Sequence, residues 1–149
     1  MTSTHVLAFN SALSQARDSA KRARQDVVYL SQMRRAINKV GKAIANSMDD
    51  NDHLNLYMVG TTPHFSVTMR NLESFKCFAL ESMLWTLDAM GTSTRTKDWP
   101  EYLNREYFYD VDGMKVCVNA YVKSDSPTCR KVQIGVETIT QPTYKIECD

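Results

Sequence analysis

The chain has 149 residues, 43% of them hydrophobic and 23% charged, which is enough for one domain with a buried core. It contains no apolar run of about 18 residues, so the sequence predicts no membrane-spanning helix, and its N-terminus lacks the pattern of a signal peptide. Residues 1–48 hold eight Lys or Arg and two Asp or Glu, whereas residues 49–149 hold ten and fifteen. We therefore expect a basic helical segment joined to a mildly acidic body.

The four cysteines are Cys77, Cys117, Cys129 and Cys148. An even number is compatible with disulfides in a secreted protein. The domain is large enough to fold without them, and Cys77 falls in an apolar helical segment. We therefore expect four free thiols and a cytoplasmic location.

Residues 4–48 have the pattern of a long helix with one apolar stripe. From Val6 onward, apolar residues recur at alternating steps of three and four, which is a heptad seam. The predicted interface residues of this seam are Phe9, Leu13, Ala16, Ala20, Ala23, Val27 and Leu30. The pattern then slips by one residue and resumes at Met33, which changes the local winding of a coiled coil.

About 35 helical residues span roughly 50 Å, whereas a compact domain of this length is about 40 Å across. The helix therefore either breaks and folds back, with Asp26 and Gly41 as the expected break points, or packs on another chain. We expect self-association through an antiparallel helix pair centred on Ala20, which would place Leu13 opposite Val27.

The stretch from Asn71 to Gly91 predicts a central helix, with Asn71 as its N-cap and Gly91 in a left-handed closing conformation. It is apolar almost all round, which is typical of a helix buried on several sides. We expect Phe78 and Leu84 to be almost fully buried.

Other segments alternate between apolar and polar residues, as half-buried strands do. Residues 54–60 and 64–70 predict one hairpin, and four further strands follow residue 104, with a turn expected near Gln141. Residues 92–104 predict a long polar loop. The expected fold is a single α+β domain over 1–149, with 4–48 as a helical, oligomerising extension. A long N-terminal helix and a central buried helix would pack on an antiparallel sheet of about six strands.

No catalytic, cofactor or metal signature is present. Asp110-Val-Asp112-Gly113 lacks the remaining ligands of a calcium loop and fits a hairpin turn better. The three histidines have no metal-ligand spacing. Cys117 or Cys129 with His64 has the residue types of a nucleophile and a base, but nothing in the sequence pairs them.

Two sets of side chains are candidate contact surfaces. Basic rows able to follow phosphates comprise Arg17, Lys21 and Arg24, then Arg35, Lys39 and Lys42; the alternative is a solvated helix face. Aromatic residues suited to a partner or ligand comprise Trp99, Tyr102, Tyr107 and Tyr109; the alternative is packing on the sheet edge.

A short, motif-free α+β chain with a helical extension resembles small accessory proteins of bacteriophages, which implies action by binding, for instance on a host or defence component. We therefore expect a non-enzymatic interaction protein that forms homo-oligomers and modulates a macromolecular partner, preferably a protein. The alternatives are a nucleic-acid-binding protein that uses the basic rows, and a small-ligand binder or enzyme with a pocket near residues 92–109.

Overall fold

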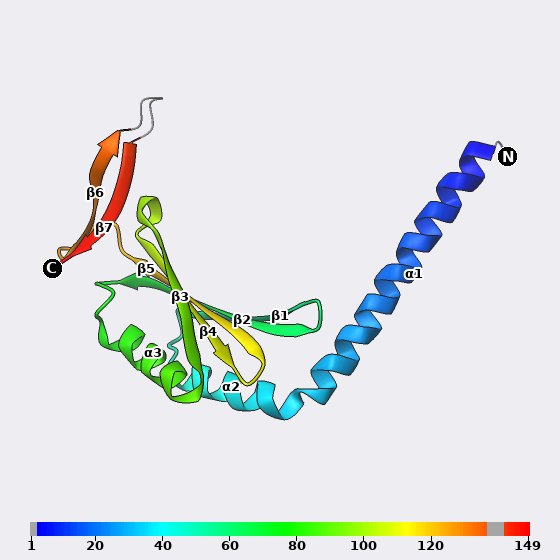
Figure 1. Cartoon of the computed structure of the whole chain (residues 1–149), viewed down its shortest axis with the longest axis horizontal. Coiled ribbons are helices and arrows are strands. Elements are labelled where there is room, and N and C mark those ends of the chain that lie inside the picture. Colours follow the sequence, from blue (N-terminus) through cyan, green and yellow to red (C-terminus); the bar gives the residue numbers. More distant parts are fainter. Residues whose placement is uncertain (1–2, 137–141) are drawn as a thin grey trace. The chain divides into compact units, whose positions relative to one another are not determined.

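The structure is a computed structural model that describes residues 3–136 and 142–149. The chain divides into two compact units, Met1–Ile37 and Asn38–Asp149. The first unit is built around one helix, α1 (Ser3–Gln32), and the second contains the remaining elements, arranged as two sheets with helices (Figure 1). The expected α+β class and the long N-terminal helix are confirmed.

The N-terminal helical segment is interrupted at Met33. α1 ends one residue earlier, and α2 (Arg34–Asn46) begins one residue later. The interruption coincides with the slip in the heptad seam, so the break points expected at Asp26 and Gly41 are wrong. Gly41 lies within α2, where an added Cβ atom would be 3.7 Å from the Phe65 ring, and this face of the helix packs on the sheet.

The second unit contains a five-stranded sheet in the order β1-β2-β5-β4-β3. Its strands are β1 (His53–Val59), β2 (Thr62–Leu72), β3 (Thr92–Trp99), β4 (Asn104–Val111) and β5 (Met114–Val122). The β1–β2 and β4–β5 pairs are the antiparallel hairpins that the alternation predicted. The sheet is mixed because β2 and β5, which join the two hairpins, run parallel.

The β4–β5 hairpin closes through a tight turn at Asp112 and Gly113. Both residues have positive φ values, 50° and 79°, as the favoured two-residue hairpin turns require. Val111 pairs directly with Met114 across this turn. The hairpin interpretation of this acidic stretch is confirmed.

The expected polar loop over residues 92–104 is wrong. β3 forms an edge strand antiparallel to β4, and a short 3₁₀ helix, η1 (Pro100–Tyr102), follows it. Every residue of β3 is exposed, so this strand has no apolar face. Alternation of apolar and polar residues, the usual signal of a half-buried strand, is absent for that reason.

The central helix, α3, covers Phe78–Met90 rather than the whole stretch from Asn71 to Gly91. Asn71 belongs to β2 and has a φ of 58°, and Cys77 occupies the N-cap position. Gly91 follows the helix in an extended conformation, not the expected left-handed one. A Cβ atom on Gly91 would overlap the carbonyl oxygen of Asp110, so close packing explains the glycine.

Only one face of α3 is covered. Three of its side chains are fully buried: Leu80, Met83 and Leu87. On the opposite face, Phe78 is 87% exposed and Trp85 is 78% exposed, and Leu84 lies between the two faces and is half-buried. The prediction that Phe78 and Leu84 are almost fully buried is therefore wrong, because apolar residues on two faces of a helix do not imply that both are covered.

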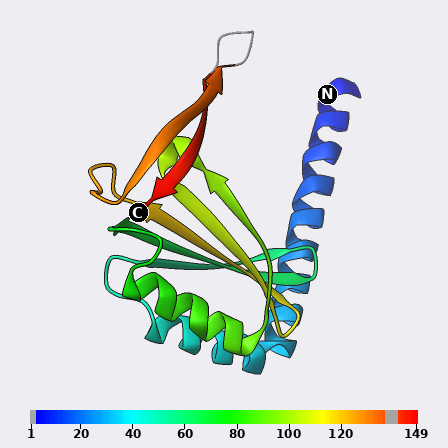
Figure 2. The same cartoon turned by 60° about the vertical axis from the view of Figure 1, so that its left-hand side comes forward.

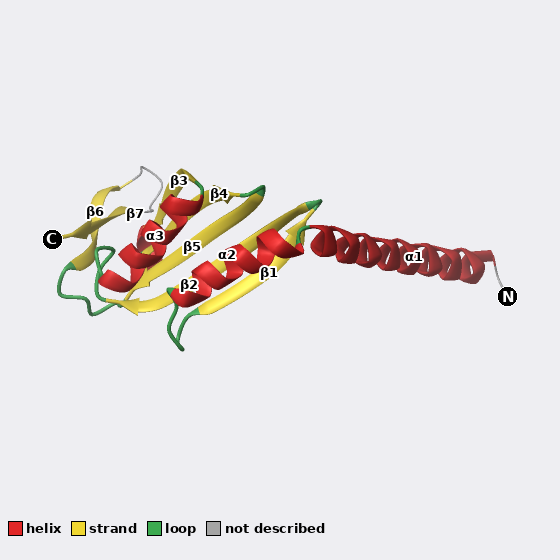
Figure 3. Cartoon of the chain, turned by 90° about the horizontal axis from the view of Figure 1, so that it is seen from below, coloured by secondary structure: helices red, strands yellow, loops and turns green. Residues whose placement is uncertain are grey.

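α2 and α3 lie on the same face of the five-stranded sheet (Figures 2 and 3). The hydroxyl of Ser47, which directly follows α2, lies 3.3 Å from the hydroxyl of Thr86 in α3. Alternate residues of the central strands form the buried core beneath the helices: Phe65, Val67, Met69, Val116, Val118, Ala120 and Val122. The unit is thus a two-layer arrangement with one hydrophobic core.

A separate two-stranded ribbon, β6 (Cys129–Val136) with β7 (Pro142–Cys148), ends the chain. Residues 3–136 and 142–149 contain seven strands where about six were expected, and β3 is the additional one. The turn expected near Gln141 lies outside the described residues. Cys129 and Cys148 pair at the base of the ribbon and form a disulfide.

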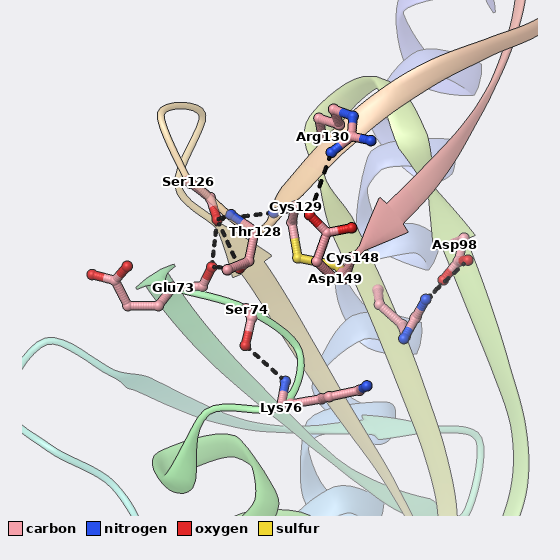
Figure 4. The surroundings of a disulfide bond; sticks show 11 residues. Glu73, Ser74, Lys76, Asp98, Ser126, Thr128, Cys129, Arg130, Cys148 and Asp149 are labelled. Atoms are coloured by element: carbon pink, nitrogen blue, oxygen red, sulfur yellow. Dashed lines mark hydrogen bonds and ion pairs between the residues drawn. A yellow bond between two sulfur atoms is a disulfide. The ribbon is translucent and has the colours of Figure 1, made fainter.

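The disulfide corrects the expectation of four free thiols, since only Cys77 and Cys117 are free. The argument for a cytoplasmic location depended on reduced cysteines, so it loses that support. Beside the disulfide, Arg130 forms an ion pair with Asp149 (Figure 4), and it forms a second one with Glu147. These contacts and the disulfide hold the start of β6 to the end of β7 at the base of the ribbon.

Ion pairs and hydrogen bonds also connect the segment before the ribbon to the segment before α3. Lys123 pairs with the Glu73 carboxylate at 2.6 Å. The hydroxyl groups of Ser126 and Thr128 donate to the Glu73 carbonyl oxygen (Figure 4). The exit of β5 is thereby held to the region that leads into α3.

We predict that Leu80→Ala lowers the free energy of unfolding by about 2–5 kcal/mol, because it leaves a cavity under α3. Leu84→Ala removes the same atoms from the same helix at a half-buried position and should cost markedly less. Urea denaturation of both variants and the wild type measures the difference. Equal losses would show that the two helix faces are not distinguished as described.

Candidate functional site

The predicted seam of α1 is an exposed surface. Phe9 is 67% exposed and Val27 is 63% exposed; Leu13 is also exposed, and Leu30 is half-buried. The alanines of the seam, Ala16, Ala20 and Ala23, are exposed as well. One continuous helix therefore carries all seven predicted interface residues.

The two basic rows lie on different helices because of the break at Met33. Arg17, Lys21 and Arg24 belong to α1, and Arg35, Lys39 and Lys42 belong to α2. All six side chains are exposed, and none forms an ion pair within the residues that the structure describes. Each row therefore presents its charge on the exposed side of its own helix.

The four predicted aromatic contacts do not form one cluster. Trp99 and Tyr102 are exposed and line a groove of about 400 Å³ together with Pro142 and Tyr144 of the ribbon. Tyr107 is half-buried, and Tyr109 is only 4% exposed. The surface reading thus applies to Trp99 and Tyr102, and the packing alternative applies to Tyr109.

Tyr109 is buried and reaches α3 at Asp88, which lies at the side of the helix. Burial is the main reason that its pKa rises to about 12, and the negative charge of Asp88 and a hydrogen bond with it add to the effect. The phenol therefore stays protonated at neutral pH. Its position anchors α3 to β4 and offers no exposed aromatic surface.

The sheet face opposite the two helices carries a polar cavity of about 450 Å³ that the sequence did not single out. Cys117, Glu106 and Ser66 are among its lining residues, and Asn119 lies beside them. The Cys117 thiol lies 3.7 Å from a Glu106 carboxylate oxygen, and the Asn119 amide donates to Ser66 Oγ at 3.2 Å. Polar residues at alternate positions of β2 and β5 were the signal for this face.

Cys117 does not have the environment of a nucleophile. Burial first, and then the negative charge of Glu106 and a hydrogen bond with it, raise the pKa of the thiol to about 12. A reactive cysteine needs the opposite shift, toward the thiolate. His64 stacks on Tyr57, with ring centroids 5.4 Å apart, and among the described residues the Cys117 thiol hydrogen-bonds to Glu106 and Asn119 rather than to His64. Cys129 is in the disulfide, so neither candidate cysteine–histidine pair is joined by a hydrogen bond.

Among residues 3–136 and 142–149, no group of three or more His, Cys, Asp or Glu side chains is placed to hold a metal ion. In the same residues, no helix has both the length and the hydropathy needed to cross a membrane.

The outward face of α3 is a second exposed apolar surface, which sequence reasoning assigned to the core. Phe78 and Trp85 lie seven residues apart along it, and Glu81 and Asp88 follow them at the same spacing. These four residues, with Ser82 and Leu84, line a shallow groove of about 580 Å³. We refer to Phe78, Ser82, Trp85 and Ala89, with the acidic Glu81 and Asp88, as the α3 outer face.

We predict that Cys117 in the native protein reacts slowly with iodoacetamide at neutral pH and that Glu106→Gln speeds the reaction. Gln has nearly the same shape as Glu but carries no negative charge. The pKa of the Cys117 thiol therefore falls, and the thiolate fraction rises. Peptide mass spectrometry gives the alkylation rate at Cys117 as pH is raised. Glu101→Gln, a change at an exposed carboxylate on η1, is the control; equal rates in all three proteins would contradict the assignment.

No known protein family, curated protein or solved structure matches this chain. A proposal about function therefore has to start from the exposed surfaces of the chain itself. They are the α1 seam, the two basic rows, the Trp99 groove, the polar cavity and the α3 outer face.

Proposed function

We propose that the protein is a non-enzymatic interaction protein that assembles into homo-oligomers through the α1 seam and, once assembled, modulates a macromolecular partner. One observation carries this proposal: a 30-residue helix presents a heptad seam whose large residues, Phe9 and Val27, are mostly exposed. A seam of this kind buries its apolar surface when another helix packs on it.

The composition of α1 supports the need for a partner. Most helical stability in proteins comes from packing of an apolar face, and the Met1–Ile37 unit contains no second layer for α1 to pack on. Its first turn has no acidic residue and its last turn has no basic residue, so charge at the helix ends adds little. Association would supply the missing packing energy.

Nucleic-acid binding is the second candidate function, and it is favoured by one specific observation. The six cations of the basic rows are exposed and form no ion pair among the described residues. Lys and Arg rows of this kind neutralise phosphates and release counterions on binding. Tyr29 is the only aromatic residue near the rows, so stacking of bases contributes little.

We predict that the wild-type protein has a molar mass above the 17.0 kDa of one chain and that Ala20→Glu returns it to that value. A charged side chain at Ala20 would hold a second helix away from the narrow centre of the seam. Gln15→Glu adds the same charge outside the seam and should leave the mass unchanged. Light scattering at high micromolar concentration measures all three, and a monomeric wild type would overturn the proposal.

If nucleic acid is the partner, reversing Arg35, Lys39 and Lys42 to Glu should abolish retention of DNA and RNA at low salt. The salt dependence of wild-type binding should be steep, because each phosphate contact releases counterions. Filter binding over a salt series gives both quantities. A wild-type protein that retains neither DNA nor RNA at low salt excludes this candidate.

A further inference from the structure

The charge of α1 disfavours pairing with a second α1. The helix carries Arg17, Lys21, Arg22 and Arg24 against Asp18 and Asp26, so its net charge is +2. Two such helices side by side would place like charges beside an interface of small side chains. The seam is better matched by a helix face that is apolar and acidic.

The α3 outer face has that character. α3 contains Glu81 and Asp88 and no Lys or Arg, so its net charge is −2. Its buried face points to the sheet, while Phe78 and Trp85 are 87% and 78% exposed on the opposite face. Exposed aromatic residues of this size are typical anchors of protein interfaces.

We infer that the α3 outer face of one copy binds the α1 helix of a second copy, an inference that rests on the proposed assembly through α1. In heptad terms, Phe78 and Trp85 occupy d positions, Ser82 and Ala89 occupy a positions, and Glu81 and Asp88 occupy g positions. In α1, Leu13 and Ala20 occupy a positions, Phe9, Ala16 and Ala23 occupy d positions, and Arg17 and Arg24 occupy e positions. A parallel pair joins g positions of one helix to e positions of the other.

One parallel register places opposite charges beside each other and also brings large side chains opposite small ones. It pairs Glu81 with Arg17 and Asp88 with Arg24. The same register aligns Trp85 with Ala16, Ser82 with Leu13, Ala89 with Ala20, and Phe78 with Phe9. Large residues of one helix therefore meet small residues of the other in the Trp85 and Ser82 layers, which is how helical interfaces interdigitate.

This contact uses two different surfaces, so the first copy keeps its α1 free and the second copy keeps its α3 outer face free. Head-to-tail contacts of this kind produce rings when the rotation closes and filaments when it does not. A pair of α1 helices, in contrast, would stop at a dimer. Assemblies larger than a dimer would therefore exclude a simple α1 pair, whereas a closed ring of two copies has the dimer mass and is distinguished from that pair by variants of α3.

The decisive variants are on α3, because substitutions there would not affect an assembly held together by two α1 helices. Trp85→Ala should weaken self-association about 10- to 100-fold, since removal of a central aromatic anchor has effects of that order. Ile134→Ala, which also removes an exposed apolar side chain but on β6, should have no effect. Light scattering over a concentration series gives the association constants, and thermal melting confirms that both variants stay folded.

A charge exchange tests the register. Glu81→Arg and Arg17→Glu should each weaken association, and the double variant that carries both should recover it, because the pair is restored with opposite signs. Wild-type association that is unchanged by Trp85→Ala and Glu81→Arg would overturn this inference and leave assembly through α1 intact. A monomeric wild type would instead overturn the proposed function itself.

Discussion

The packing of two helices on one face of the five-stranded sheet is the constraint on which the rest of this structure depends. β2 and β5 form the parallel centre of the sheet, and their inward side chains meet α2 and α3. Close approach requires a glycine at the end of α3, because a Cβ atom on Gly91 would overlap the Asp110 carbonyl group. Because one sheet face is used in this way, the other face is left to polar residues.

This arrangement also decides which surfaces remain for binding. In α3, the side chains that pack into the core are Leu80, Met83 and Leu87. The aromatic residues on the other side of the helix therefore contribute nothing to the core. A natural protein rarely keeps a nearly fully exposed tryptophan beside an exposed phenylalanine without a use, since such patches favour association. The polar cavity on the opposite sheet face holds a thiol whose raised pKa disfavours the reactive thiolate form.

The sequence predicted those elements whose two faces differ in polarity. The β1–β2 and β4–β5 hairpins were found because each strand alternates, and the slip in the N-terminal seam coincided with the break at Met33. β3 was missed because both its faces are exposed. The error at Phe78 has another cause: periodicity shows that a helix has apolar faces but not which of them is covered. The Cys129–Cys148 disulfide depends on the strand register of the ribbon, which no local pattern determines.

The candidate surfaces show the same division. The α1 seam and the basic rows were readable because each lies on one helix, where spacing alone fixes which residues share a side. The surroundings of the aromatic residues from Trp99 to Tyr109 could not be predicted from spacing. These residues span a strand, a 3₁₀ helix and a second strand, which present their side chains to different environments. The α3 outer face can be recognised as an exposed surface only when the buried face of the helix is known. Once Leu80 and Leu87 are assigned to the sheet, the residues half a turn away form an exposed seam of opposite charge to α1, and this complementarity is the basis of the proposed contact between copies.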